Sequence, residues 1–418
     1  MFKRAQRLKD VRGFGIDRVA ADADARTAAR DDWPVLRMEN LDTDLPLPRE
    51  AIPETVRGLE TAAANSWLPF TGDLDLRAAV SDFLAERTGH RYDPEREILI
   101  TSGGTEAILD VMLATVDPGD QVLLTDPTYA GIVNRARLAG GVPRLAPYRV
   151  ESGEWRLDLD AFAAAAADGP VLAVLMSPSM PSGAVLTRAE WAAVCQICAG
   201  REVPLLYDAA MERLLFDDHP LVHPLHFDGM ADRTVIAGSL SKEHRMIGWR
   251  IGWVAGPAEL VESAGWMHIY NTTTPTGIAR AAATAVLRGD QGHVADAVAE
   301  LERRRDTILD ALAGWPVVRP AGGWSMLVNA VQLGITPAEL ARALLEDAAI
   351  AATPMTGWGG DIAGQYVRLV FSAEPVDRLR TIPDRVAGTS LEAYGSSLRS
   401  PTASRAGARK QRPEASPP

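Results

Sequence analysis

Short apolar runs recur between residues 97 and 254 of the chain, separated by longer stretches that carry helix signals. Each run is rich in Val, Ile or Leu and leads into a polar or glycine-containing turn, which is typical of a buried strand. We expect these strands at 97–101, 121–125, 142–148, 171–176, 204–208, 233–237 and 250–254. The pattern therefore predicts a set of buried strands with polar side chains at their ends.

The pattern changes near residue 290. Long helix-like stretches, such as 294–312, then alternate with short apolar runs. These runs predict strands at 324–328, 350–352 and 366–371. The alternation indicates a second, smaller α+β domain. Residues before about 35 are charged and rich in Ala and Asp with a weak helical pattern, so we expect the first structured segment at Val35–Leu41.

Composition narrows the class of protein. With 418 residues, 47% of them hydrophobic, the chain has enough material for two globular domains. A formal net charge of −12 argues against a nucleic-acid partner or an anionic membrane. No apolar run reaches transmembrane length, and Met1–Arg4 leads into a charged stretch without the core of a signal peptide. We expect a cytoplasmic enzyme.

Two groups of residues have the composition of a metal site, but neither is expected to be one. Cys195 and Cys198 follow a capping box, Thr187–Glu190, so both thiols fall on one face of a helix and are expected in the core. Prolines interrupt the second group, which we expect in a solvated loop. Its members are His219, His223 and His226. The sequence therefore predicts no metal site.

The segment with the clearest chemistry is Gly238–Lys242. Ser239 and Ser241 lie just before Lys242 in the sequence. Arg250 follows eight residues later, between Gly248 and Gly252. A neutral lysine amine condenses with aldehydes, while hydroxyls and a guanidinium fork hold a phosphate dianion. The segment indicates a site for a phosphate-bearing aldehyde, although an ordinary surface lysine after a serine-rich turn would give the same sequence.

Three further segments place candidate ligand-binding groups at the ends of strands. Gly103 and Gly104 would let the backbone approach an anion, with Thr105 near the start of a helix. Tyr129 follows a strand and could stack on a planar ring. Asp208 ends an apolar strand, where open α/β sheets present ligands. Each segment has a simpler alternative. The glycine pair could be a common turn, Tyr129 could be a core or rim residue, and Asp208 could cap the following helix.

Together these motifs resemble those of the class I/II aminotransferases, the fold-type-I pyridoxal-phosphate enzymes. The resemblance covers residues 35–390 and implies an α/β fold with a mostly parallel, seven-stranded sheet in a large domain, a smaller C-terminal α+β domain, and a site completed by a second subunit. We expect four parts. Residues 1–56 form an N-terminal segment that joins the small domain, 57–290 form the large domain, 291–392 form the small domain, and 393–418 form a Ser/Pro-rich disordered tail.

The resemblance also implies a role for each motif. Lys242 would form an imine with pyridoxal 5'-phosphate and move the α-proton of the substrate, and Asp208 would keep the pyridine nitrogen protonated. Tyr129 would stack on the ring. Arg368 would bind the α-carboxylate of an amino acid, although a surface arginine on an edge strand is the alternative. The phosphate would be held by Gly103, Gly104, Thr105, Ser239, Ser241 and Arg250.

Three cofactor-contact positions depart from the family pattern. Met180 and Met211 replace an asparagine and a tyrosine that donate hydrogen bonds to the ring hydroxyl oxygen. A thioether sulfur donates none. Trp67 replaces a tyrosine that reaches the phosphate of the neighbouring subunit, so its assignment as a cofactor contact presumes a homodimer.

The reaction implied by the resemblance is transfer of an amino group from an L-α-amino acid to a 2-oxo acid. Met180 and Met211 leave open a pyridoxal-phosphate lyase, cyclase or oxidase on the same scaffold. A non-catalytic effector-binding module would need a DNA-binding segment or a basic face. About 35 residues before the fold and a net charge of −12 provide neither.

Overall fold

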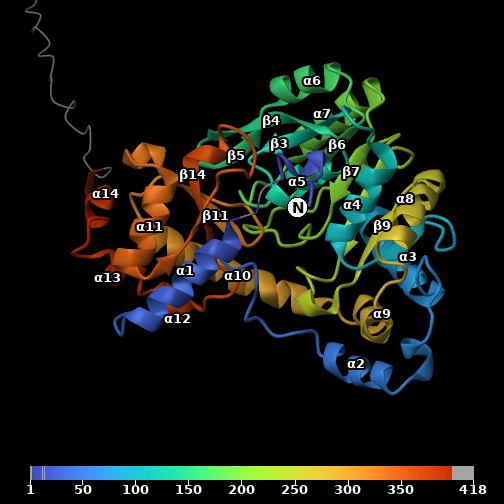
Figure 1. Ribbon diagram of the computed structural model, residues 1–418, viewed down its shortest axis with the longest axis horizontal. Helices are drawn as coiled ribbons and strands as arrows, with labels where there is room; N and C mark the ends of the chain where they lie inside the picture. Colours follow the sequence, from blue (N-terminus) through green and yellow to red (C-terminus); the bar gives the residue numbers. More distant parts are fainter. Residues whose placement is uncertain (1, 12, 14, 398–418) are drawn as a thin grey trace, which may run out of the picture.

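The computed structural model of the protein describes residues 2–11, 13 and 15–397. In its larger part, helices pack against one sheet (Figure 1). The strand order of this sheet is β2-β9-β8-β7-β6-β3-β4-β5. In that order the strands are Ile98–Thr101, Gly252–Ala255, Thr234–Ser239, Leu205–Asp208, Leu172–Met176, Gln121–Asp126, Val142–Glu151 and Glu154–Leu157.

Most neighbouring strands of this sheet are parallel. Strands β8, β7, β6, β3 and β4 run in one direction, whereas β9 is antiparallel to β2 and β8. The predicted strands are present and the mostly parallel sheet is confirmed. The predicted total of seven was one too few, because β5 folds back on β4 as an antiparallel hairpin. Ser152 and Gly153 turn this hairpin with positive φ angles of 52° and 84°.

The helices of the larger part are α2 (Ala51–Leu59), α3 (Leu74–Thr88), α4 (Gly104–Thr115), α5 (Ala130–Leu138), α6 (Leu159–Ala167), α7 (Arg188–Gly200), α8 (Ala258–Asn271) and α9 (Arg280–Arg288). Most of them cover the sheet, whereas α2 packs against α9. The capping box at Thr187 and Glu190 begins α7 as predicted. Cys195 and Cys198 are buried, which confirms them as core residues, and burial raises the pKa of both thiols to about 12.

A smaller sheet and its helices lie to one side of the large sheet (Figure 1). This antiparallel sheet has the order β10-β11-β14-β13. Its strands are Val317–Val318, Ser325–Asn329, Tyr366–Val370 and Thr353–Pro354. The helices are α10 (Gly292–Ala311), α11 (Pro337–Ala348), α12 (Val376–Leu379), α13 (Ile382–Val386) and α14 (Glu392–Ser397). The strand predicted at 350–352 is β12 (Ile350–Ala351), which pairs with β1 and not with this sheet.

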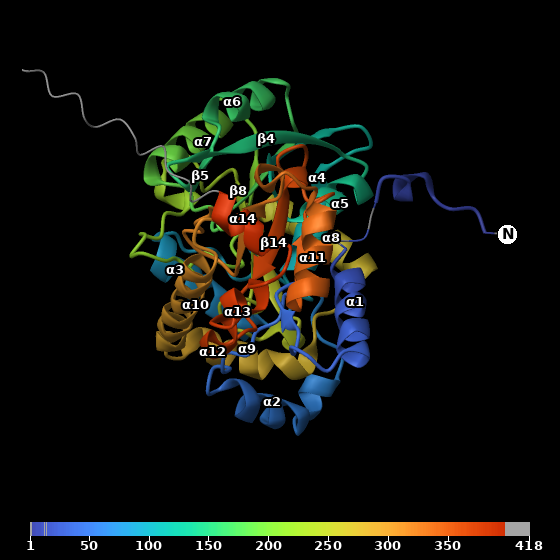
Figure 2. The ribbon, with the colours of Figure 1, turned by 90° about the vertical axis from the view of Figure 1, so that its left-hand side faces the viewer.

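The N-terminal region is more ordered than predicted. Helix α1 (Ile16–Ala29) precedes the segment at Val35 that we expected to be the first structured one, so that expectation was wrong. Figure 2 shows α1 beside α11, and Arg26 on α1 donates to the carbonyl oxygen of Glu346 at 3.4 Å. Strand β1 (Leu36–Arg37) then pairs in parallel with β12. Tertiary contacts stabilise a helix that has a weak pattern of its own.

At the other end of the chain, α14 continues past the boundary at residue 393 that we expected for the tail. Residues 398–418 of that expected tail lie outside the described residues. Within the part of the chain that the structure describes, no helix is long and apolar enough to cross a bilayer.

Candidate active site

Lys242 lies in the connection between β8 and β9, at the carboxyl end of β8. Its Nζ donates a hydrogen bond to the backbone carbonyl oxygen of Leu41 at 3.2 Å and lies 4.2 Å from the centroid of the Trp324 ring. Burial lowers the pKa of Lys242 to about 8, and the positive charge of Arg368 acts in the same direction. An appreciable fraction of the amine is therefore uncharged near neutral pH, which is the form that acts as a nucleophile or base.

Ser239, Ser241 and Arg250 lie next to Lys242 on the same connection. The guanidinium of Arg250 bridges two turns, because Nη1 lies 3.5 Å from the Ser241 hydroxyl and Nη2 donates to the carbonyl oxygen of Ser102 at 3.2 Å. Arg250 takes the left-handed conformation, with φ 55°. The backbone therefore turns sharply to bring this cation beside the two serine hydroxyls.

The turn from β2 into α4 faces that guanidinium. Helix α4 begins at Gly104, so the amides of Gly104 and Thr105 have no acceptor within the helix and are available to an anion. Gly103 has φ 91°, and a Cβ added to it would lie 2.4 Å from Nη2 of Arg250. Only glycine fits this approach. The predicted phosphate-binding groups are thus brought together on two adjoining turns.

Asp208 ends β7, directly beside β8 in the sheet. One carboxylate oxygen accepts a hydrogen bond from the amide of Ala210 at 3.1 Å. Burial raises the pKa of Asp208 to about 6, and the positive charges of Arg135 and Lys242 only partly oppose this effect. The carboxylate is therefore placed where a cationic group on a ligand would stabilise it.

A cavity of about 150 Å³ joins these groups. Tyr129, Met180 and Met211 line it together with Asp208 and Lys242. The remaining lining residues are Leu41, Gly104, Thr105, Ile108, Met176, Ala210, Ser239, Ser241, Ile247 and Arg250. The two methionines are thus neighbours of the same cavity although they come from different loops.

Arg368 lies on β14 between β11 and β13 and is fully buried, so the alternative of a surface arginine on an edge strand was wrong. Its Nη2 donates to the carbonyl oxygen of Glu39 at 2.8 Å and to the Thr353 hydroxyl at 3.2 Å. Among the described residues, its Nε and Nη1 have no hydrogen-bond partner. Burial lowers the pKa of Arg368 to about 9. Two buried donors without acceptors suit an anionic group on a ligand.

Several contacts of the site were not predicted from the sequence. The resemblance implied that residues 35–48 enter the active site, but not that the carbonyl oxygen of Leu41 accepts a hydrogen bond from Lys242. The ring of Trp358 lies 4.4 Å from the guanidinium of Arg368 and 5.8 Å from the ring of Tyr129. Arg135 donates to the carbonyl oxygen of Thr105 at 2.7 Å. Glycines on both sides of Trp358 were the one local signal that could have suggested a loop near a ligand.

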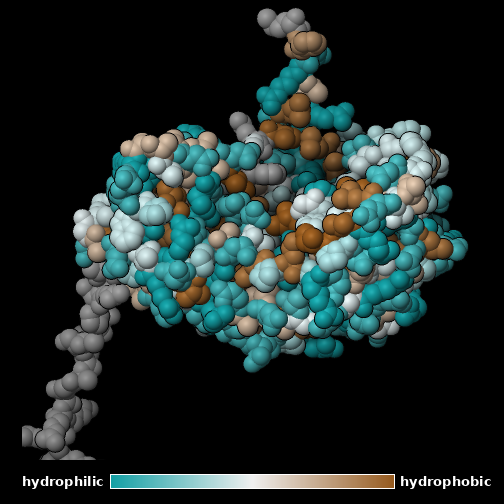
Figure 3. All heavy atoms as spheres, turned by 90° about the horizontal axis from the view of Figure 1, so that it is seen from below, coloured by the Kyte–Doolittle hydropathy of each residue, from teal (hydrophilic) through white to brown (hydrophobic). Residues whose placement is uncertain are grey.

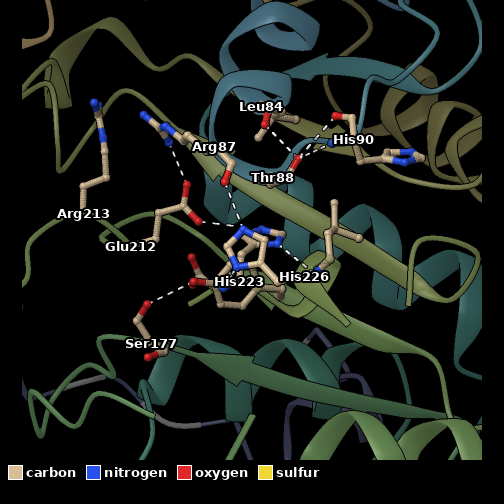
Figure 4. A network of polar contacts seen from close by, with 12 residues as sticks. Leu84, Arg87, Thr88, His90, Ser177, Glu212, Arg213, His223 and His226 are labelled. Atoms are coloured by element: carbon tan, nitrogen blue, oxygen red, sulfur yellow. Dashed lines mark hydrogen bonds and ion pairs between the residues drawn. The ribbon is translucent and has the colours of Figure 1, made fainter. Parts of the chain in front are cut away.

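A buried cluster of charged residues lies behind the lysine turn (Figure 4). Arg87 contacts Glu212 at 2.7 Å and Glu243 at 3.4 Å, and Arg213 contacts Glu243 at 2.7 Å. Glu243 directly follows Lys242, so these ion pairs fix one end of the lysine turn to α3. Residues 243–245 are all buried.

His223 was predicted in a solvated loop, and that prediction was wrong. The side chain is fully buried, with Nε2 3.7 Å from the carboxylate of Glu212 (Figure 4). Burial lowers the pKa of His223 to about 3, and His226 acts in the same direction. His226 contacts the carbonyl oxygen of Arg87 at 3.0 Å through Nε2. Long-range packing against α3, which leaves no local pattern, buries this loop.

Two predicted cofactor contacts, Gly103 and Trp67, are not among the residues that line the cavity, and Trp67 is the more distant case because it lies at the surface. Its side chain is 74% exposed and packs edge-on against Phe70 at 5.9 Å. The indole N–H of Trp249 donates a hydrogen bond to the Thr55 hydroxyl at 2.7 Å. Trp324 does contact Lys242, as described above.

These groups fit pyridoxal phosphate. The two serine hydroxyls, the Arg250 guanidinium and the α4 amides form a donor set for a phosphate dianion, and the absence of a Cβ at Gly103 leaves room for that guanidinium. Lys242 and Asp208 line the same cavity at the carboxyl ends of adjacent parallel strands. Fold and site together define the chain as a fold-type-I pyridoxal-phosphate enzyme.

Comparison with known proteins gives the family. The family model described as aminotransferase class I and II matches residues 37–380, and the chain belongs to this family. An LL-diaminopimelate aminotransferase of Desulforudis audaxviator is 30% identical over 392 residues, which cover 93% of this chain and 98% of the relative. An arginine–pyruvate transaminase of Pseudomonas aeruginosa is 31% identical over 363 residues, which cover 85% of this chain and 89% of the relative.

The fold agrees with this assignment. The structure of N-succinyldiaminopimelate aminotransferase from Mycobacterium tuberculosis superposes with a TM-score of 0.85 at 28% identity, covering 92% of this chain and 99% of that one. The protein is therefore a pyridoxal-phosphate-dependent aminotransferase. Its substrates are an amino acid and an oxo acid.

Proposed function

We propose that Lys242 and Asp208 are the catalytic residues of this aminotransferase. The observation that carries the proposal is that both line one cavity with the anion-binding groups Ser239, Ser241 and Arg250. We further propose that these groups and the start of α4 hold the cofactor phosphate. Tyr129 and the two methionines, Met180 and Met211, complete the cofactor contacts in the same cavity.

The bound cofactor supplies an aldehyde and an electron-withdrawing ring. The Asp208 carboxylate would accept a hydrogen bond from the protonated ring nitrogen and so stabilise its charge. The Nζ of Lys242 would take the α-proton of the substrate and return a proton during transfer. Its pKa of about 8 suits both the removal and the return of a proton, because the charged and the neutral amine are both well populated near that pH.

We propose that Arg368 binds the α-carboxylate of an L-α-amino acid and, in the reverse half-reaction, that of a 2-oxo acid. Its Nε and Nη1 lack partners among the described residues, and a carboxylate accepts from both in a fork. The relatives named above transfer amino groups of LL-diaminopimelate and of arginine.

The test uses the purified holoenzyme, pools of L-amino acids and no oxo acid. We expect one pool to convert the bound cofactor to its aminated form with an equal amount of 2-oxo acid, and added pyruvate or 2-oxoglutarate to reverse the change. Lys242→Ala should slow both directions by at least about 10³-fold, since a positioned base contributes about 10²–10⁴-fold. A Lys242→Ala variant with more than a tenth of the wild-type rate would contradict the assignment.

We propose a homodimer in which Trp67 reaches the cofactor phosphate of the partner subunit. The indole is 74% exposed in the single chain. Ile52, Val56 and Leu59 on the neighbouring α2 are 54%, 50% and 52% exposed, which is unusual for three apolar residues on one face of a helix. Figure 3, viewed from the side on which α2 lies, shows hydrophobic residues gathered among polar ones.

We also propose the division of the chain into an N-terminal segment, a large domain, a small domain and a tail, and a cytoplasmic location. Two free buried thiols, Cys195 and Cys198, agree with a reducing compartment and so with the cytoplasmic location.

Limited proteolysis tests the division of the chain, since cuts should fall near residues 56, 290 and 392. Fractionation of the source cells tests the location.

A further inference from the structure

A second cluster of buried polar side chains lies beside the phosphate-binding turn. Glu106 and Asp110 occupy successive turns of α4, and His268 faces them from α8. The Nδ1 of His268 lies 3.2 Å from Oε1 of Glu106 and 3.9 Å from Oδ2 of Asp110. The exposed fractions of these residues are 7%, 0% and 0% for Glu106, Asp110 and His268. None of them has a role in the transfer reaction described above.

Asp110 is the incomplete member of this cluster. Its Oδ2, which faces the His268 ring, has no hydrogen-bond partner among the described residues, and Oδ1 has only a long contact of 3.4 Å with the Asn271 amide. The two buried carboxyl groups lie on either side of one imidazole nitrogen, so a single ion could reach all three side chains.

We propose that Glu106, Asp110 and His268 bind a divalent transition-metal ion of the zinc type. One imidazole nitrogen and two carboxylate oxygens are a usual donor set for such an ion, and its charge would balance both carboxylates. With metal–ligand bonds of about 2.0–2.1 Å, donors in a tetrahedral site lie about 3.3 Å apart. The separation of 3.2 Å between Nδ1 of His268 and Oε1 of Glu106, which is a hydrogen-bond distance without the ion, is close to that value. The separation of 3.9 Å to Oδ2 of Asp110 is longer, so this carboxylate would move toward the ion. The Thr272 hydroxyl, which bonds to Oε1 of Glu106, would orient that carboxylate.

The ion would have a structural role in the aminotransferase site. The other carboxylate oxygen of Glu106 accepts a hydrogen bond from the amide of Ser102. The carbonyl oxygen of Ser102 in turn accepts from Nη2 of Arg250. A metal ion at Glu106 would therefore join α8 to the turn that we propose as the phosphate site, and its removal should weaken cofactor binding without abolishing it.

Cobalt(II) is the probe for this site, because its visible spectrum reports its ligands. The holoenzyme is dialysed against a chelator and then titrated with Co²⁺, with bound metal measured by mass spectrometry. We expect about one Co²⁺ per chain, visible absorption of a four- or five-coordinate ion, and no thiolate charge-transfer band. Asp110→Asn should weaken binding at least about tenfold, because it removes one ligand.

The control is the double variant Cys195→Ser/Cys198→Ser, which removes the one pair of thiols that could bind the ion elsewhere. It should bind Co²⁺ as the wild type does. Binding that is lost in this control, or that is unchanged in Asp110→Asn, would identify an adventitious ion only and overturn the proposal, as would the absence of stoichiometric binding. If Asp110→Asn does not fold, His268→Gln gives the same comparison. These results do not depend on the amino-transfer assay, so the proposed catalytic roles stand or fall separately.

Discussion

Asp208 is a buried carboxyl group whose negative charge is only partly stabilised by the nearby positive charges of Arg135 and Lys242. Burial raises its pKa from 3.8 to about 6, so the folded chain binds this proton more tightly than the unfolded chain does. Below pH 3.8 the carboxyl group is protonated in both states, so it does not lower the free energy of unfolding. As the pH rises from 3.8 to about 6, the unfolded chain loses this proton first and the free energy of unfolding falls, and above about pH 6 it falls no further on account of this group. About two pKa units correspond to about 3 kcal/mol in the free energy of unfolding.

Asp208→Asn should therefore stabilise the cofactor-free protein while it impairs the holoenzyme. At about pH 7.5 we expect its free energy of unfolding to exceed that of the wild type by up to about 3 kcal/mol. The difference should disappear near pH 4. Urea denaturation of both cofactor-free proteins at the two pH values measures it. Equal stability of the two at the higher pH would show that the Asp208 carboxylate is not destabilised by burial.

Arg368→Lys tests the second buried charge. Lysine keeps the positive charge but loses the planar fork, and a charge-assisted hydrogen bond contributes about 1.5–3 kcal/mol. We expect the KM of the amino donor to rise about 10- to 100-fold, while the spectrum of the bound cofactor stays the same. Arg18→Lys, at a side chain that is 89% exposed, is the matched control and should leave KM unchanged. An unchanged KM in Arg368→Lys would argue against carboxylate binding by this residue.

At the scale of elements, the parts of the site that could be predicted are those with a local signal. Strands β7 and β8 are continuous apolar runs, and Asp208 and the lysine turn stand at their ends, so the strands and their terminal residues could be predicted locally. That the two belong to one site was implied by the family resemblance. The paired glycines before α4 likewise predicted an anion-binding turn.

The parts that could not be predicted depend on contacts between distant segments. The carbonyl of Leu41 reaches Lys242 across about two hundred positions, and His223 is buried by α3. Helix α1 has a weak pattern and is held by α11. Glu106 and Asp110 have helical spacing, but His268 comes from another helix, so the sequence did not indicate that these three side chains lie together.

The glycine turn before α4 gives an element-scale prediction. In Gly103→Ala the new Cβ would lie 2.4 Å from Arg250, and the backbone would keep a φ of 91° that alanine rarely adopts. We expect the dissociation constant of pyridoxal phosphate to rise at least about tenfold in fluorescence titrations. Gly153→Ala, at φ 84° with no atom within 4 Å, imposes the strain without the clash. Equal affinities in the two variants would mean that contact with Arg250 is unimportant.

At the scale of the whole molecule, the exposed apolar face of α2 predicts the oligomeric state. Val56→Glu places a charge among Ile52 and Leu59 on a surface that we propose is covered by the second subunit. We expect light scattering to report a monomer for the variant and a dimer for the wild type, with a loss of at least about tenfold in activity. Arg18→Glu is the matched control on an exposed helix far from α2. A wild-type monomer with full activity would contradict the shared site.

The path of the N-terminal segment has a consequence for the order in which the protein matures. Residues 36–44 are synthesised early, yet their partners are among the last to emerge. Leu36 pairs with Ile350, the amide of Val370 donates to the carbonyl of Met38, and the Ser372 hydroxyl donates to that of Asp42. On the ribosome, this segment therefore lacks its partners from the smaller part until translation is almost complete. The large domain can fold first, but a competent enzyme can arise only from a nearly finished chain.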